Sequence, residues 1–370
     1  MLWTSFRDTL IFDCDFNDEL NVGLISSYSK LIFSDYKLNK KTNNIIFKCY
    51  SDEDFYDIYA FYFSNNLDCD KSNFNQSVSN LPIGITHLTF GCEFNQDVSA
   101  LPPFLTYLFF GHKFNKDVSK LPSTLTHLTF RFEFNQDVSK LPKTLTHLTL
   151  GECFNHSISK LPFSLTHLTF GNRFNSNVSS LPLTLTHLTF GSNFNKDISK
   201  LPQTLTHLTF GYNFNKDISK LPPTLTHLTL DCEFEHDISV LPPTLTHLTL
   251  CSEFTHHCNI PSTIKYLQLK SNNQRIINSL PSSIIELELS DNFNSDMDNL
   301  PNSIKKLIIN KRSHYNVNLN CLPDFIEELQ LNHNYKKRIL HIPSNLKKLI
   351  CHKKYAYKND FAHCEIQTYK

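Results

Sequence analysis

The chain has 370 residues, and its 35 Lys and Arg balance its 35 Asp and Glu, so the formal net charge at pH 7 is zero. This balance gives no global field that would attract nucleic acid or an anionic membrane, and we expect neither as a partner. No apolar run reaches the roughly 20 residues of a membrane-spanning helix, and the first residues lack a signal-peptide core. The eleven cysteines do not recur in one repeat column, as a disulfide ladder would require. We therefore expect an intracellular, cytoplasmic protein.

Residues 1–73 contain two decayed copies of a repeat that becomes regular further along, and residues 34–73 hold no clear register. The segment 10–17 aligns without gaps on residues 88–95, and residues 31–33 resemble a second copy. The end of a repeat array must cover its exposed layer. We predict that residues 1–73 form an N-terminal cap built from degenerate repeats.

Residues 74–260 repeat a block of twenty residues with almost no drift. The consensus is L-P-x-T-L-T-H-L-T-F-G-x-x-F-N-x-D-I-S-K, and Leu-Pro recurs every twenty residues from Leu81 to Leu241. A strict period of this length indicates one supersecondary unit that is stacked many times. We therefore predict a solenoid.

The block could be read as a helix, because its apolar positions 14, 18, 1, 5 and 8 have heptad-like spacing. Proline at position 2 of every copy opposes a helix, where it would cost about 3 kcal/mol each time. In residues 125–130, apolar Leu128 and Phe130 alternate with His127 and Thr129, which is the period of a strand. We predict a mainly β, right-handed solenoid of about 20-residue repeats with one parallel sheet. The chain turns out of the strand at position 11, which is Gly in most copies. Arg131 occupies that position in another copy, which indicates that a positive φ is not required there.

After Leu241 the Leu-Pro or Ile-Pro punctuation continues with less regular spacing. We predict that residues 261–350 are divergent repeats of the same solenoid and that residues 351–370 form a C-terminal cap or tail. The outward strand positions become charged in these copies, at Glu286, Glu288, Lys305, Lys306, Glu327, Glu328, Lys347 and Lys348. Two interpretations are open: the charges neutralise one another across the sheet, or they form a charged docking face.

Position 7 is the most regular polar column, and its alternation with buried leucines predicts that it faces outward. With four of the later charges it forms our candidate binding surface: His87, Tyr107, His127, His147, His167, His187, His207, His227, His247, Glu286, Lys306, Glu328 and Lys348. The histidines could form a polar surface that was copied with the repeat, a face that contacts a ligand or protein, or a strip in which imidazoles ~4.8 Å apart share zinc. Because like charges resist simultaneous protonation, we expect pKa values mostly below about 6.5.

Three further patterns carry predictions. Asn at position 15 is expected to point inward and to bond the backbone of adjacent turns. Asp at position 17 and Lys at position 20 are expected to form exposed ion pairs, each of which contributes little to stability. The segment 256–258, His-His-Cys, is a compact group of metal-type side chains, but neighbours in an extended segment face opposite ways.

The arrangement L-P-x-x-L-x-x-L-x-L resembles the leucine-rich repeat, and F-N-x-x-I-S-x-L-P, with a literal Asn259-Ile260-Pro261 in one copy, resembles the FNIP repeat. The resemblance implies a leucine-rich-repeat-like fold and a source among social amoebae or the giant viruses that infect amoebae, with the host cytoplasm as the location if the source is viral. It also implies an F-box in many members, which recruits a ubiquitin-ligase scaffold. Residues 1–73 show no F-box helix pattern.

We conclude from the sequence that the chain is a non-catalytic repeat scaffold that mediates protein–protein interaction, as a monomer and without a cofactor. Fold alone does not establish function. Two alternatives therefore remain: the substrate-recognition subunit of a ubiquitin ligase, and a metal- or histidine-dependent enzyme. A third possibility is an array expanded by tandem duplication with little selection on any contact surface.

Overall fold

The computed structural model describes residues 3–6, 9–12, 25–33, 73–231, 233–251, 259–270, 272–291 and 293–369. The chain divides into two compact units, residues 1–176 with 180–185 and residues 177–179 with 186–370. Within the described ranges, no helix has the length and apolar character needed to cross a membrane. Most of residues 1–73, where an F-box was sought, and all of 256–258 lie outside these ranges.

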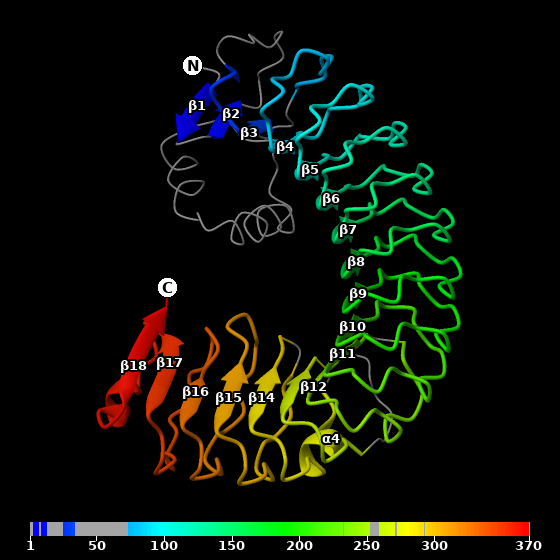
Figure 1. The fold of residues 1–370 in the computed structure, drawn as a ribbon. Coiled ribbons are helices and arrows are strands. Elements are labelled where there is room, and N and C mark those ends of the chain that lie inside the picture. The colour runs from blue at the N-terminus through cyan, green and yellow to red at the C-terminus, as the bar shows by residue number, and fades with distance from the viewer. Residues whose placement is uncertain are drawn as a thin grey trace. The chain divides into compact units, whose positions relative to one another are not determined.

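The first unit is a stack of short strands (Figure 1). Its strands are β1 (Trp3–Phe6), β2 (Thr9–Phe12), β3 (Lys30–Phe33), β4 (His87–Thr89), β5 (Tyr107–Phe109), β6 (His127–Thr129), β7 (His147–Thr149) and β8 (His167–Thr169). Strand β1 is antiparallel to β2, and β2 to β8 pair in parallel. The register places Leu10, Leu31 and Leu88 side by side, so β2 and β3 continue the regular parallel sheet.

The second unit continues the same pattern through ten parallel strands. They are β9 (His187–Thr189), β10 (His207–Thr209), β11 (His227–Leu230), β12 (His247–Leu250), β13 (Tyr266–Leu269), β14 (Glu286–Leu289), β15 (Lys306–Ile309), β16 (Glu328–Gln330), β17 (Lys348–His352) and β18 (Glu365–Tyr369). A short helix α4 (Gln274–Asn278) and a 3-10 turn η1 (Lys358–Phe361) interrupt the connections. The predicted leucine-rich-repeat-like parallel solenoid is confirmed.

Strands β4 to β17 each begin after a turn that the proline column starts. The carbonyl of Pro122 accepts a hydrogen bond from the N–H of Leu125 at 3.2 Å, which closes a four-residue turn. The missing N–H of proline costs nothing there, because no strand ladder passes through position 2. The turn therefore sets the start of the strand at position 7 in every copy.

The core consists of columns of identical side chains. The Leu or Ile at position 5, Leu at position 8, Phe or Leu at position 10 and Phe at position 14 are buried in the regular turns. Within one turn, Phe90 stacks on Phe94 with ring centroids 3.7 Å apart, and Phe110 stacks on Phe114 at the same distance. The rings of one turn are buried by the turns on either side, so a single turn cannot cover its own aromatic side chains.

The turns are closer together on the strand side than on the opposite side. In the first unit, rings at position 7 are 4.1 to 4.2 Å apart between turns, as for His127 and His147. Position 10 rings are 5.4 to 5.6 Å apart, and those at position 14 are 6.1 to 6.3 Å apart. The second unit gives the same series. Each turn is therefore a wedge, and the strands lie on the concave side of each unit.

The polar columns bond to the backbone in two ways. Asn at position 15 accepts a hydrogen bond from the next turn, as where Asn95 Oδ1 accepts from the N–H of Asn115 at 3.0 Å. The backbone bond was predicted, but the inward direction was wrong, because these side chains are exposed or half-exposed. Asp117 accepts from the N–H and hydroxyl of Ser119, at 3.0 and 2.7 Å, and not primarily from a lysine. Both bonds lower the pKa of this carboxyl.

The aromatic stack predicts a large difference between two Phe→Ala changes in adjacent repeats. Phe154 is fully buried, whereas Phe163 is 84% exposed. Phe154→Ala should lower the free energy of unfolding by about 3–5 kcal/mol, because it leaves a cavity between turns. Phe163→Ala should change it by less than about 0.5 kcal/mol. Urea unfolding followed by circular dichroism measures both, and equal midpoints would contradict the assignment of position 14 to the core.

Gly171 is required for close packing of turns. Its φ is not in the left-handed region, but a Cβ would overlap the carbonyl oxygen of Gly151 in the preceding turn. Gly171→Ala should therefore destabilise the first unit by about 1–3 kcal/mol, because a neighbouring turn must move. Gly84→Ala is the matched control, since nothing lies within 4 Å of its Cβ position. Thermal unfolding of the two variants should show a lower midpoint for Gly171→Ala alone.

Candidate binding surface

In the first unit, position 7 forms a continuous stack of rings on the outward strand face. His87, Tyr107, His127, His147 and His167 follow one another in register. Adjacent ring centroids lie 4.1 to 4.2 Å apart, and all rings are half-buried. The structure thus brings these predicted residues together as one ladder.

The second unit carries a matching ladder that ends in a residue the sequence did not reveal. His187, His207, His227 and His247 stack at 3.8 to 4.1 Å. Tyr266 then lies 4.1 Å from His247 and pairs with it in register. The distance from Leu241 to Ile260 is 19 residues and not 20, so Tyr266 falls at position 7 only when that copy is numbered from Ile260.

A threonine anchors each imidazole of the ladders. The hydroxyl of Thr126 lies 2.9 Å from Nδ1 of His127 and 3.1 Å from the carbonyl oxygen of Thr106 in the preceding turn. The same arrangement recurs at Thr206 beside His207. Because Nδ1 is held by the hydroxyl, Nε2 lies on the far side of the ring. The rings are thereby fixed in orientation before any partner arrives.

Histidines in both ladders resist protonation, as His127 and His227 show. The pKa of His127 is lowered to about 4, first by burial and then by His147, His87 and His167. The pKa of His227 is also lowered to about 4, with burial again the first cause. The low pKa values agree with the expectation from the sequence, but burial contributes more than the repulsion that the expectation was based on. At pH 7 these histidines are neutral.

The parallel orientation of the rings opposes metal binding between neighbours. Ring planes of His127 and His147 differ by 12°. Nitrogen lone pairs lie in the ring planes, so those of stacked rings run side by side and do not converge on one tetrahedral ion. No group of three or more His, Cys, Asp or Glu side chains suited to a metal ion occurs in the part of the chain that the structure describes.

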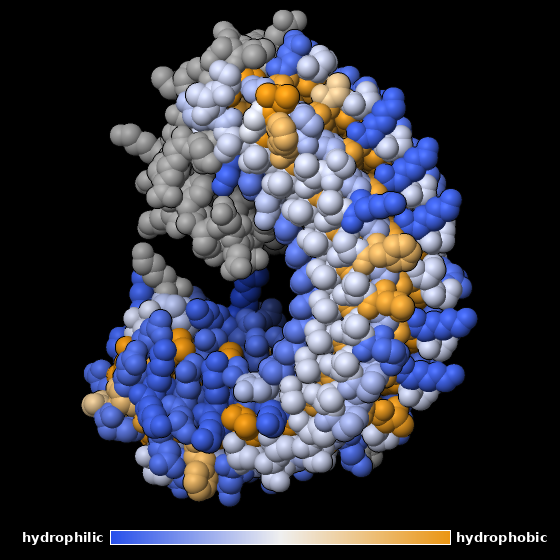
Figure 2. Space-filling view, in the orientation of Figure 1, coloured by the Kyte–Doolittle hydropathy of each residue, from blue (hydrophilic) through white to orange (hydrophobic). Residues whose placement is uncertain are grey.

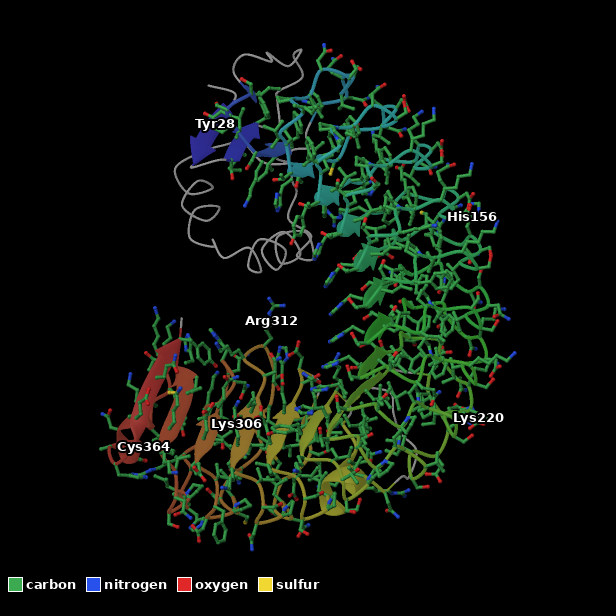
Figure 3. All side chains as sticks on the ribbon, viewed as in Figure 1. Tyr28, His156, Lys220, Lys306, Arg312 and Cys364 are labelled. Atoms are coloured by element: carbon green, nitrogen blue, oxygen red, sulfur yellow. The ribbon has the colours of Figure 1, made fainter. Side chains whose placement is uncertain are left out.

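The later strands of the second unit replace the rings with charges of alternating sign. In register these are Glu286, Lys306, Glu328 and Lys348. Lys306 forms an ion pair with Glu286 at 3.1 Å, and Figure 3 labels Lys306 on β15. In the neighbouring column, Glu327 pairs with Lys305 and Lys347 at 3.3 and 2.6 Å, which lowers its pKa. These contacts favour neutralisation across the sheet over a docking face of one sign.

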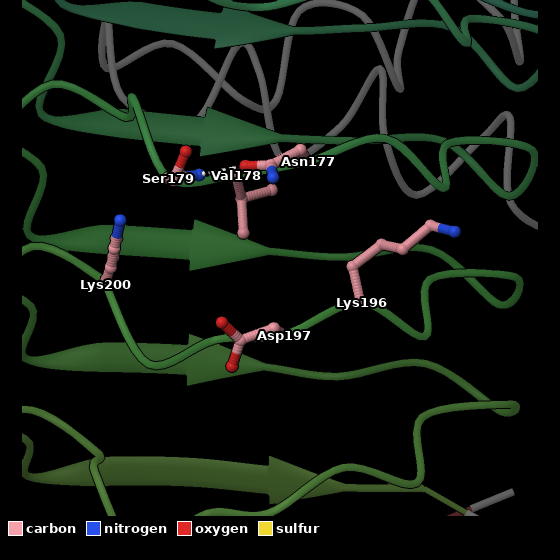
Figure 4. A pocket seen from close by; sticks show the side chains of 6 residues that line it. All are labelled: Asn177, Val178, Ser179, Lys196, Asp197 and Lys200. Carbon is pink, nitrogen blue, oxygen red and sulfur yellow. Dashed lines mark hydrogen bonds between the residues drawn. The ribbon is translucent and has the colours of Figure 1, made fainter.

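A hollow of about 260 Å³ in the second unit is lined by residues that are not part of the strands (Figure 4). Its lining includes Lys196, Asp197 and Lys200, together with residues 177–179. The polar groups of this hollow serve local turns: Asn177 Oδ1 accepts from the N–H of Ser179 at 2.7 Å. The ordered, repeated polar groups of the strand face make it the stronger candidate site.

These features define a leucine-rich-repeat-like solenoid in which the strand face of each unit carries an ordered polar surface. The FNIP repeat family matches residues 74–113, 154–193, 177–213, 194–233, 214–252, 255–292 and 272–312. The matched ranges cover more than half of the chain, which therefore belongs to the FNIP-repeat family.

One solved structure similar to this chain is also a leucine-rich-repeat protein. CroV588, a circular leucine-rich-repeat protein from a giant virus, is 38% identical over 76% of this chain and 49% of its own, with a TM-score of 0.56. The chain thus spans about half the length of that protein. InlJ of Listeria monocytogenes (16% identity, 92% of this chain and 68% of that one, TM-score 0.45) and YopM of Yersinia enterocolitica (20%, 74% and 74%, 0.36) are more distant. No curated protein matches the chain.

The ladder pKa values predict a stability loss in mild acid. The folded state holds the pKa of His127 and His227 near 4, whereas an unfolded histidine has a pKa of about 6.5. Between these values the unfolded chain binds more protons, so stability should be constant above pH 7 and fall as the pH drops from 6.5 to 4.

His127→Gln and His227→Gln should flatten that fall, because they remove groups that must otherwise stay unprotonated. His156→Gln is the control, since Figure 3 places His156 away from the strands. Urea midpoints at half-unit pH steps measure the slope. The same slope in the wild type and the ladder variants would show that the ladders do not resist protonation.

Proposed function

We propose that this protein is a non-catalytic scaffold that binds a protein partner through the outward faces of its strands. The observation that carries the proposal is the pair of ring ladders, which are half-buried, neutral at pH 7 and fixed in orientation by Thr hydroxyls. A rigid surface loses little side-chain entropy when a partner docks. Solenoids of this kind use their concave surfaces for extended contacts.

The side chains of the outward strand face suit a protein partner better than a highly charged ligand. Its rings offer aromatic contact area, and its Thr hydroxyls donate and accept hydrogen bonds. Aromatic side chains are enriched at the centres of protein interfaces, while charged ones are depleted there. In the second unit, the self-paired charges from Glu286 to Lys348 would form a polar rim beside the ladder.

Position 9 offers the sharpest test, because it lies on the same strand face without belonging to the ring stack. Thr129→Arg and Thr209→Arg would each place a long cation on the face and should weaken partner binding at least about tenfold. Ser123→Arg and Gln203→Arg add the same side chain at exposed positions before the strands.

Partners captured by the wild type from its native cells would be identified first, and the affinity of each variant for them measured next. Loss of binding in the position 9 variants alone supports the strand face. Unchanged affinity in those variants, or an equal loss in the controls, would contradict it.

A further inference from the structure

The zero net charge of the chain conceals a strong separation of charge along it. Residues 301–370 contain thirteen Lys and Arg but only five Asp and Glu, whereas residues 1–300 contain 22 Lys and Arg and 30 Asp and Glu. The expectation that the chain does not attract nucleic acid rested on its total charge, and it therefore does not apply to the last turns. Figure 2 shows a strongly hydrophilic surface over the C-terminal strands.

The excess positive charge gathers where the last strands end. Lys311 and Arg312 follow β15, His333 follows β16, and Lys353 and Lys354 follow β17. The turns are adjacent, because the N–H of His333 donates to the carbonyl of Lys311 at 2.9 Å. All five side chains are exposed, and Figure 3 places Arg312 beyond the end of β15. We call these five residues the basic rim.

The basic rim lacks the counter-charges that its neighbours have. Lys306 on β15 pairs with a glutamate, as do Lys305 and Lys347, which directly precede β15 and β17. Arg338 pairs with Asp360. The segments 310–320, 332–341 and 352–358, which include the rim, contain no Asp or Glu. Among the described residues, no ion pair joins a carboxylate to any of the three rim lysines or to Arg312. Their charge is thus available to an external anion.

Aromatic rings lie among the rim cations. The ring of His333 is 3.9 Å from that of buried His352, and Nζ of Lys311 lies 4.8 Å from the ring centroid of Tyr369. The hydroxyl of Tyr369 donates to the carbonyl of Leu331 at 2.7 Å, which fixes that ring in place. The exposed ring of His333 can therefore stack on a flat group that approaches the rim.

We propose that the basic rim binds single-stranded nucleic acid, with the four rim cations contacting phosphates and His333 contacting a base. Lysine is depleted at protein interfaces, whereas lysine-rich, acid-free surfaces are typical of phosphate-backbone binding. Cations interleaved with exposed aromatic rings are typical of single-strand sites, because an unpaired base has an open face for stacking. This surface is separate from the ring ladders and does not depend on the protein-binding proposal.

Fluorescence anisotropy of the full chain with labelled 15-nucleotide single-stranded RNA and DNA tests the proposal. Four phosphate contacts predict a slope of about −3 for the logarithm of the association constant against the logarithm of salt concentration. The variant Lys311→Gln, Arg312→Gln, Lys353→Gln, Lys354→Gln should lose affinity by on the order of tenfold or more at 50 mM salt and lose most of this slope.

The control removes the same charge from the exposed edge of the regular repeats, by Lys120→Gln, Lys140→Gln, Lys200→Gln and Lys220→Gln, and should bind as the wild type does. Circular dichroism confirms that both variants fold. Three results would overturn the proposal: no binding of single strands at 50 mM salt, equal loss in rim and control variants, or binding of a duplex or of poly-glutamate as tight as that of single strands.

Discussion

One backbone carbonyl in each turn holds the next turn in register, and the other features depend on it. The carbonyl oxygen of Thr106 accepts hydrogen bonds from the N–H groups of Thr126 and His127, at 2.9 and 3.0 Å. The same pair of bonds recurs at position 6 in turn after turn of both units. Because the bonds join equivalent positions, every side chain lies beside its own copy in the next turn. A slip of one residue would bury the imidazoles and expose the leucines.

This register turns a repeated sequence into repeated surfaces. Rings at position 7 stack with centroids 3.8 to 4.2 Å apart, because the wedge shape of each turn brings the strands together there. The same proximity removes water from the imidazoles, and their pKa falls mainly for that reason. A row of histidines that could have become a charged strip is instead a neutral, ordered face.

The sequence predicted those features that follow from period alone. Alternation within one copy was enough to place His127 outward and Leu128 inward, and the repetition of Asn at position 15 was enough to assign it to bonds between turns. Local competition was harder to foresee. Asp117 bonds to Ser119 two residues later, because a short acidic side chain captures the nearest N–H before a flexible lysine can reach it.

Two further features could not be predicted because they depend on neighbouring turns. The copy that contains Tyr266 has a shorter spacing, so only the strand pairing in the structure shows that Tyr266 lies beside His247 in the ladder. The basic rim combines loops of three divergent copies, at positions that vary freely in the regular repeats, so no column in the sequence marks it. Acidic residues elsewhere in the chain balance the charge of the rim, so the total composition does not reveal that this region is basic.

Deletion of one turn tests most directly the claim that equivalent turns in register determine the structure. Removal of residues 121–140 takes out twenty residues and should leave a shorter solenoid in which β5 pairs with β7, because any regular turn can stack on any other. Removal of residues 121–130 takes out half a turn and should disrupt the sheet around the gap. Amide hydrogen exchange at β5 and β7 is the measurement. The account predicts that protection is retained after the twenty-residue deletion and lost after the ten-residue deletion. Equal loss of protection in both proteins would contradict it.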